Sequence, residues 1–160
     1  MADLQIREAT PEDVALILGF ITSLAIYEKA AHEVLASESD IRESLFGDDA
    51  TAYGLICSLN NNPIGFAVYF FNYSTWLGKP GLYLEDLYIE PEYRSSGAGK
   101  ALLKYLAKTA VTKGCGRFEW SVLDWNTPAR SFYESLGAQP QDEWIIYRLA
   151  GKELEKLAYS

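Results

Sequence analysis

The stretch Arg94-Ser95-Ser96-Gly97-Ala98-Gly99 combines residue types that could hold a phosphate group. It follows an expected strand and begins an expected helix, and the unpaired N–H groups at a helix start attract anions. Its glycines let a phosphate approach the backbone closely. The stretch therefore predicts a pyrophosphate site, and a glycine-rich helix start without a ligand is the alternative.

Two common phosphate motifs do not fit this stretch. A Walker A loop needs a glycine five residues before its Gly-Lys pair and a hydroxyl residue after the lysine. Arg94 occupies the position of that first glycine, and Ala101 follows Lys100. A dinucleotide-binding fingerprint needs a third glycine, and Leu102 stands at its position. The loop therefore belongs to neither class.

Composition and charge narrow the function classes. The chain has 160 residues, of which 49% are apolar and 22% charged, and we expect one globular domain over residues 1–160. The formal net charge is −8. A nucleic-acid binder needs a cationic footprint, so no nucleic-acid partner is expected, whereas an acidic surface can attract a small cation.

Cysteine and histidine are scarce. Cys57 and Cys115 are too few for a disulfide framework, and His32 is the only histidine. A zinc site and a histidine-dependent hydrolase are therefore disfavoured, and we expect no metal. Residues 1–20 show no signal-peptide pattern, and the apolar run 64–71 is too short to cross a bilayer. We expect a cytoplasmic protein with no membrane partner.

Hydrophobic spacing and punctuation residues predict an α/β chain. Thr10 is expected to cap a helix that runs to about Tyr27, with Asp13 completing a capping box. Ser37 or Ser39 caps a second helix. The expected order is β-α-α-β-β-β-α-β-α-β, a mixed sheet with an antiparallel half and a parallel segment, covered by helices. The elements are a strand from Ile6, helices 11–27 and 37–47, strands 52–59, 64–72 and 82–89, a loop at 74–81, a helix between Gly97 and Gly114, a strand at 118–123, a helix from Asn126 to Gly137 and a strand at 144–149.

The pattern Arg94-x-x-Gly97-x-Gly99, after a strand and before a long amphipathic helix, resembles the acetyl-CoA loop of the GNAT acetyltransferases. The order of the elements is also similar to that fold. Further residues resemble the spermidine/spermine (diamine) acetyltransferase branch, including its thialysine-acetylating relatives. They are Tyr27, Glu28, Gly65, Phe66, Ala67, Tyr69, Phe70, Trp76, Gly78, Lys79, Tyr83, Leu84, Glu85, Asp86, Asn126, Pro128, Phe132, Tyr133, Gly137 and Ala138.

The resemblance implies acetyl-CoA as cosubstrate, held by a loop that binds pyrophosphate. It also implies a bulged strand that splays from its parallel neighbour and leaves room for the pantetheine arm. A homodimer is implied as well. The cofactor-binding residues implied are Leu87, Tyr88, Ile89, Arg94, Ser95, Ser96, Gly97, Ala98, Gly99, Lys100, Asn126, Pro128 and Tyr133.

The resemblance also assigns roles in catalysis. Glu85 takes the ammonium proton of the amine, and Tyr133 donates a proton to the leaving thiolate. Main chain around Leu87 to Ile89 supplies an N–H for the oxyanion. The implied substrate-binding residues are Tyr27, Glu28, Trp76, Glu85 and Asp86.

The expected function is acetyl transfer to a primary amine of a small cation, either a diamine or polyamine or a lysine-like amino acid such as thialysine. The amine attacks directly in a ternary complex. Ser74 stands where polyamine-acetylating members carry an acidic residue, which disfavours long polyamines. The alternatives are acetylation of protein lysines or N-termini, and a CoA-binding module without catalysis.

Overall fold

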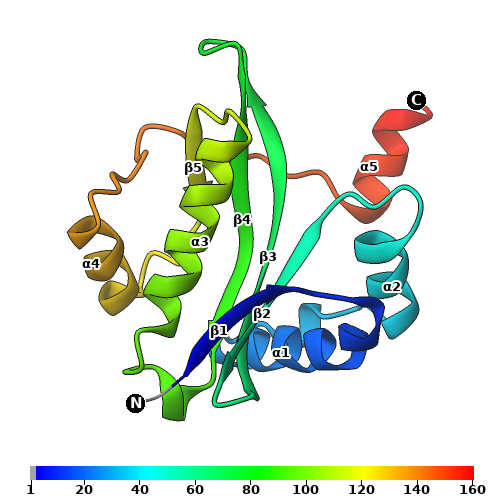
Figure 1. Cartoon of the computed structure of the whole chain (residues 1–160). Helices are drawn as coiled ribbons and strands as arrows, with labels where there is room; N and C mark the ends of the chain where they lie inside the picture. Colours follow the sequence, from blue (N-terminus) through cyan, green and yellow to red (C-terminus); the bar gives the residue numbers. More distant parts are fainter. Residues whose placement is uncertain (1–2) are drawn as a thin grey trace. The chain divides into compact units, whose positions relative to one another are not determined.

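The computed structural model describes residues 3–160 (Figure 1). By their contacts, the residues form two compact units, the first ending at Ser121 and the second covering Val122–Ser160. The expectation of one domain over the whole chain stays a prediction.

The first unit is built on one five-stranded sheet in the order β1-β2-β3-β4-β5. β1 to β4 pair antiparallel with their sequence neighbours, and β4 pairs parallel with β5. The expected mixed sheet, with an antiparallel half and a parallel segment, is confirmed. The strands are β1 (Leu4–Glu8), β2 (Tyr53–Leu59), β3 (Asn62–Ser74), β4 (Lys79–Ile89) and β5 (Arg117–Trp120).

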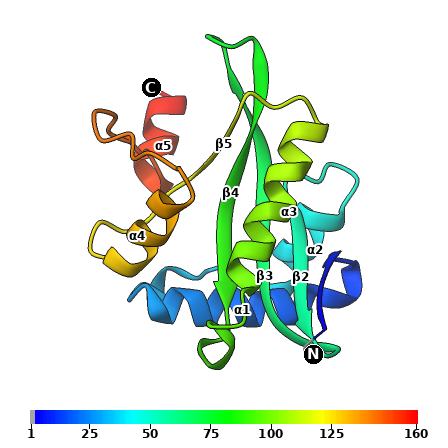
Figure 2. The same ribbon diagram turned by 60° about the vertical axis from the view of Figure 1, so that its left-hand side comes forward.

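Helices cover both faces of this sheet. α1 (Val14–Tyr27) and α2 (Glu38–Phe46) lie on one face, and α3 (Ala98–Thr112) lies on the other (Figure 2). The core beneath α1 includes Phe66 and Tyr88 from neighbouring strands. In the part of the chain that the structure describes, no helix is both long and apolar enough to cross a membrane.

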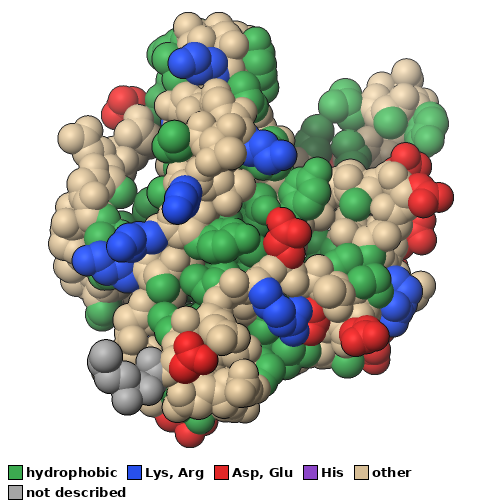
Figure 3. Space-filling model, in the orientation of Figure 1, with side chains coloured by type: hydrophobic (Ala, Val, Ile, Leu, Met, Phe, Trp, Pro, Cys, Tyr) green, Lys and Arg blue, Asp and Glu red, His purple; other side chains and the backbone are tan. Residues whose placement is uncertain are grey.

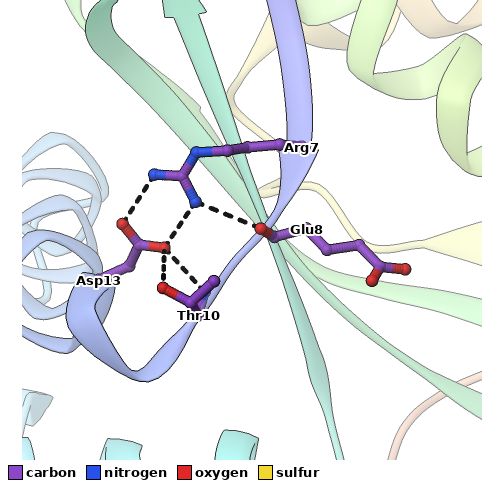
Figure 4. Close-up of polar contacts among 4 residues, drawn as sticks. All are labelled: Arg7, Glu8, Thr10 and Asp13. Carbon is purple, nitrogen blue, oxygen red and sulfur yellow. Dashed lines mark hydrogen bonds and ion pairs between the residues drawn. The ribbon is translucent and has the colours of Figure 1, made fainter.

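The start of α1 is fixed by the polar contacts shown in Figure 4. A 3₁₀ turn (Pro11–Asp13) precedes the helix, and the Thr10 N–H donates to Asp13 Oδ2 at 2.8 Å. Arg7 donates to both carboxylate oxygens of Asp13, at 2.7 and 2.9 Å. The expected cap at Thr10 is therefore confirmed, and the bidentate ion pair between Arg7 and Asp13 connects it to β1.

Two hairpins set the register of β2, β3 and β4. Asn60 and Asn61 both have positive φ, as a two-residue hairpin turn requires, so the turn expected there is confirmed. The β3–β4 connection differs from the expected loop at 74–81. β3 continues to Ser74 and β4 begins at Lys79, because backbone pairing extends to the tip despite Pro80 and Gly81.

The second unit contains α4 (Thr127–Ser135) and α5 (Gly151–Ala158). The strand expected at 144–149 is wrong, because these residues form no strand and no helix. The run is rich in aromatic and β-branched residues, but β-propensity needs a neighbouring strand to pack against. Among Val122–Ser160 there is no strand to pair with, and the run stays irregular.

Candidate active site

A β-bulge in β4 lies at Glu85. Val68 of β3 pairs with Asp86 and Tyr69 pairs with Leu84, so Glu85 has no opposite residue. A bulge bends its strand and turns side chains away from the regular alternation. The bulge implied by the resemblance is therefore present.

The parallel pairing between β4 and β5 stops at the same place. Gly81 to Leu84 pair with Arg117 to Trp120, and β5 ends at Trp120. The strand expected at 118–123 is therefore too long at its end, because β4 bends away where the ladder would continue. From Asp86 to Ile89, β4 pairs with β3 only, which is the splayed pair that the resemblance implies.

Leu87, Tyr88 and Ile89 form the splayed end of β4. Tyr88 and Ile89 are buried, and the Tyr88 ring lies 6.1 Å from the Phe20 ring of α1. Leu87 pairs with Ala67 of β3. The side chains of Tyr88 and Ile89 pack in the core. This strand end can therefore offer a ligand its main-chain groups.

The glycine loop forms an uncapped helix start. Gly97 is the N-cap of α3, has φ +85°, and provides no side-chain cap. The first N–H groups of a helix have no intrahelical partner. A Cβ built on Gly97 or Gly99 would meet no atom within 4 Å, so the space above both backbones is open.

Other residues of the loop differ in what they offer. Ser95 is exposed and Ala98 is buried. The Ser96 hydroxyl donates to Tyr93 O at 2.6 Å, which holds the turn before α3. Lys100 is exposed and begins a row of lysines along α3 with Lys104 and Lys108. Lys and Arg side chains follow the course of this helix on the face in Figure 3.

Three carboxylates gather near the bulge. Glu28 follows the last residue of α1, and Glu85 and Asp86 come from β4. Burial, with repulsion from Glu85 and Glu28, raises the pKa of Asp86 to about 6. Burial also raises the pKa of Glu28. The group is a concentration of negative charge beside the splayed strands.

This arrangement differs from the sequence-based expectation in one respect. The resemblance makes Glu85 the proton acceptor, and a desolvated carboxylate would be the better base, but Glu85 is exposed. The desolvated carboxylate is Asp86, which lies between the buried Leu84 and Tyr88 in the alternation of side chains along β4.

Tyr27 and Trp76 occupy different ends of the first unit. Tyr27 is the last residue of α1, next to Glu28, and the Arg94 guanidinium lies 4.9 Å from its ring centre. Trp76 lies at the tip of the β3–β4 hairpin and is 85% exposed. At about 3.3 Å per residue, roughly 20 Å of β4 separates that tip from Glu85. The structure therefore does not bring Trp76 to the carboxylates.

Ser74 has a structural role at this tip. It is 2% exposed, and its Oγ accepts a hydrogen bond from the Leu77 N–H at 3.2 Å. Gly78, with φ +64°, donates its N–H to Ser74 O at 2.9 Å. The position where polyamine-acetylating members are acidic is therefore part of the turn in this chain.

The remaining expected site residues lie in the second unit. Asn126 caps α4, since its side-chain oxygen accepts from the Ala129 N–H at 3.4 Å. Pro128 occupies the first turn, where its missing N–H costs nothing. Tyr133 is on α4, with its ring 5.8 Å from that of Phe132.

Metal ligation is not indicated. Among residues 3–160, no group of three or more His, Cys, Asp or Glu side chains is arranged to hold an ion. The carboxylates at the bulge are thus a charge cluster without the arrangement of a metal site.

Comparisons with known proteins agree with this geometry. The model of the acetyltransferase (GNAT) family matches residues 18–138. The chain is 38% identical to a thialysine N-epsilon-acetyltransferase of Mus musculus, covering 99% of both chains. It is 32% identical to an L-ornithine N5-acetyltransferase of Arabidopsis thaliana, covering 96% of this chain and 87% of that one.

A solved structure also resembles this one. It is an integron cassette protein from the mobile metagenome of V. cholerae, 28% identical, with a TM-score of 0.81 and 98% of both chains covered. The family match spans the bulge, the splayed strands and the glycine loop. The chain belongs to the GNAT family of acetyltransferases and is an N-acetyltransferase.

Proposed function

We propose that this enzyme acetylates a primary amine of a small cationic substrate, either a short diamine or a lysine-like amino acid such as thialysine. The observation that carries the proposal is the bulge at Glu85, which brings a carboxylate cluster to the place where β4 leaves β5. The relatives named for thialysine and L-ornithine support a cationic amino-acid acceptor.

Acetyl-CoA is the proposed cosubstrate, and the glycine loop fits it. GNAT acetyltransferases use acetyl-CoA. The open space above Gly97 and Gly99 allows a pyrophosphate to reach the backbone at the start of α3. The exposed Lys100 and Lys104 add positive charge along this helix in a chain of net charge −8. Bound acetyl-CoA supplies the acetyl group as a thioester, which the amine attacks directly in a ternary complex.

The carboxylate cluster is the proposed acceptor site. Burial, with repulsion from Glu85 and Glu28, raises the pKa of Asp86. A bound ammonium group relieves that repulsion and gains charge-assisted hydrogen bonds. We propose that Tyr27, at the end of α1, forms part of the same site.

Proton transfer needs a base and an acid. Glu85 is the proposed base, because it is exposed at the bulge and next to the desolvated Asp86. A general base typically contributes about 10²–10⁴-fold in rate. Tyr133 is the proposed donor to the leaving thiolate, since a phenol with a pKa of about 10 can protonate a thiolate.

Main-chain and capping groups complete the proposed cofactor site. The N–H groups of Leu87 to Ile89 are the proposed donors to the oxyanion, because that strand end has no β5 partner. Asn126 and Pro128 are proposed to border the pantetheine arm while they shape the start of α4.

The β3–β4 tip argues for a short substrate. Ser74 is buried in the turn and offers no negative charge to a distant ammonium group. Trp76 lies about 20 Å along β4 from the bulge. Only a long amine substrate could therefore contact both Trp76 and the carboxylates at the bulge.

Assembly and location are also part of the proposal. A homodimer is proposed as well, as the resemblance to the diamine acetyltransferase branch implies. A reducing, cytoplasmic location is supported by the free thiols of Cys57 and Cys115. The negative net charge disfavours nucleic acid as a partner, and we propose none, nor a membrane.

The test is a panel of amines with purified protein and acetyl-CoA. CoA release is measured with thialysine, lysine, ornithine, putrescine, spermidine and spermine, and each product is identified by mass spectrometry. The proposal expects the highest kcat/KM with a short amine or a lysine-like amino acid. Release that requires a protein substrate, with every small amine inert, would instead indicate protein acetylation.

A further inference from the structure

We propose that Arg94 is a positioning residue, which couples the acetyl-CoA loop to the acceptor end of α1 by holding Tyr27. The inference rests on the proposed function and deepens it. It assigns the Arg94 side chain to alignment of the acceptor site instead of to phosphate binding.

The first support is the anchor of the guanidinium on β4. Arg94 Nε donates to Ile89 O at 3.1 Å, and Ile89 is the last residue of that strand. The Arg94 N–H donates to Pro91 O at 3.3 Å, which places its backbone in the turn before α3. Both bonds hold Arg94 against the turn that joins β4 to the glycine loop.

The second support is a stack of rings around the guanidinium. Its central carbon lies 4.9 Å from the Tyr27 ring centre and 5.6 Å from that of Tyr88. A cation within about 6 Å of a ring centre is attracted to the ring face. Arg94 therefore binds one tyrosine from α1 and one from β4.

Tyr88 is the more firmly held ring of this stack. It is 6% exposed and belongs to the core beneath α1, where it packs beside Phe20. Tyr27 is 40% exposed and ends its helix, so its ring is less buried than that of Tyr88. Arg94 thus ties the less buried ring to the more buried one, and the residue that follows Tyr27 is Glu28 of the carboxylate cluster.

Contact with two rings at once suits arginine better than lysine. A planar guanidinium can stack on two rings and still donate from Nε, whereas the lysine ammonium is a compact point charge. Lysine does, however, serve as a phosphate ligand. The substitution Arg94→Lys therefore separates the two roles, because it keeps a charge for phosphate and removes the stacking.

The experiment is a double-mutant cycle on the full-length enzyme, with Arg94→Lys, Tyr27→Leu and the double variant. KM for the amine and KM for acetyl-CoA are measured for each. Loss of one exposed cation–π contact corresponds to about a two- to fivefold change. We expect Arg94→Lys to raise the amine KM by that factor in wild type and to have no effect in the Tyr27→Leu background. Tyr27→Phe keeps the ring and should preserve the coupling.

Arg42→Lys is the matched control, since Arg42 is an exposed arginine of α2 that donates to Pro11 O at 3.4 Å. It should leave both KM values unchanged. A raised KM for acetyl-CoA with an unchanged amine KM would overturn the proposal and make Arg94 a phosphate ligand. Additive effects of the two substitutions on the amine KM would also overturn it, because they would show that Arg94 does not act through Tyr27.

Hydrogen exchange separates this inference from the proposed function. The amides of Glu28 and Ala30 bond to Leu24 O and Ala25 O in the last turn of α1. Arg94→Lys should speed their exchange by about two- to fivefold, whether or not any amine is acetylated. Unchanged exchange would overturn the positioning role, whereas an inactive wild type with faster exchange in the variant would overturn only the proposed function.

Discussion

Leu84 and Trp120 form the last pair of the parallel ladder between β4 and β5, and Glu85 is the next residue of β4. The end of pairing and the bulge therefore coincide. This coincidence opens the two strands beside the carboxylates of Glu85 and Asp86. It explains how one local irregularity can serve both an acetyl donor and an amine acceptor.

The first prediction concerns the glycine loop. Gly99→Ala should raise KM for acetyl-CoA by about tenfold or more, because its methyl group would occupy the open space where a pyrophosphate approaches the backbone. Its helix should not be weakened, since alanine is favoured over glycine in a helix by about 0.5–1 kcal/mol. Steady-state kinetics and thermal unfolding measure the two effects.

Gly19→Ala is the matched control for this change. Gly19 lies within α1, and a Cβ there also meets no atom within 4 Å. The control should keep KM for acetyl-CoA unchanged. An equal KM in wild type and Gly99→Ala would place the cosubstrate elsewhere.

The second prediction concerns the base. Glu85→Gln should lower kcat at neutral pH by about 10²–10⁴-fold, or by less if water replaces the carboxylate. Profiles between about pH 6 and 9 test this, and wild-type rates throughout that range would remove Glu85 from the role.

The third prediction concerns Asp86, whose pKa rises from 3.8 to about 6 in the folded protein. Between pH 3.8 and about 6, Asp86 is ionised in the unfolded chain but protonated in the folded protein. The group therefore lowers the free energy of unfolding progressively as pH rises, and this loss of stability is complete above the folded pKa. Asp86→Asn should therefore stabilise the protein at about pH 7.5, by at most about 3 kcal/mol, and change little near pH 4. Denaturant unfolding at both values measures this.

The same substitution should weaken the acceptor site. Without the Asp86 charge, KM for the amine should rise by about tenfold, the equivalent of one charge-assisted hydrogen bond. In wild type, the amine KM should rise as pH falls through about 6, because a proton on Asp86 competes with the ammonium group. A KM independent of pH in wild type would contradict this role.

The fourth prediction concerns the start of α1. Asp13→Ala should destabilise the fold by about 1–3 kcal/mol, because it removes the paired contact with Arg7 and the acceptor for the Thr10 N–H. The Arg7 ion pair lowers the pKa of Asp13, so this stability is present at neutral pH and is lost as pH falls through the lowered pKa. Glu119→Gln, which breaks the exposed pair with Arg117, should cost no more than about 1 kcal/mol.

Local signals predicted much of the framework. The caps at Thr10 and Ser37, the turn at Asn60 and Asn61, and the glycine start of α3 follow from chemistry within a few residues. The run 144–149 misled the prediction, since its residue types favour a strand but pairing depends on distant backbone.

The candidate site was predictable only in part. Glu85 and the glycine loop carried a recognisable pattern, whereas the burial of Asp86 and the contact of Arg94 with Tyr27 depend on how β4 and α1 pack. Both arise from contacts between residues far apart in the sequence, which local patterns do not encode. Ser74 likewise showed its role in the turn only through its bond to the Leu77 N–H.

The central claim is acetyl transfer from acetyl-CoA to a small cationic amine. Its most direct test is a competition assay in which thialysine, ornithine, putrescine and spermine share one reaction with limiting acetyl-CoA, and mass spectrometry counts each acetylated product. We expect one acetylated amine for each CoA released, with a short amine or a lysine-like amino acid ahead of spermine by about tenfold or more. Spermine as the preferred acceptor, or CoA release without any acetylated amine, would contradict the account.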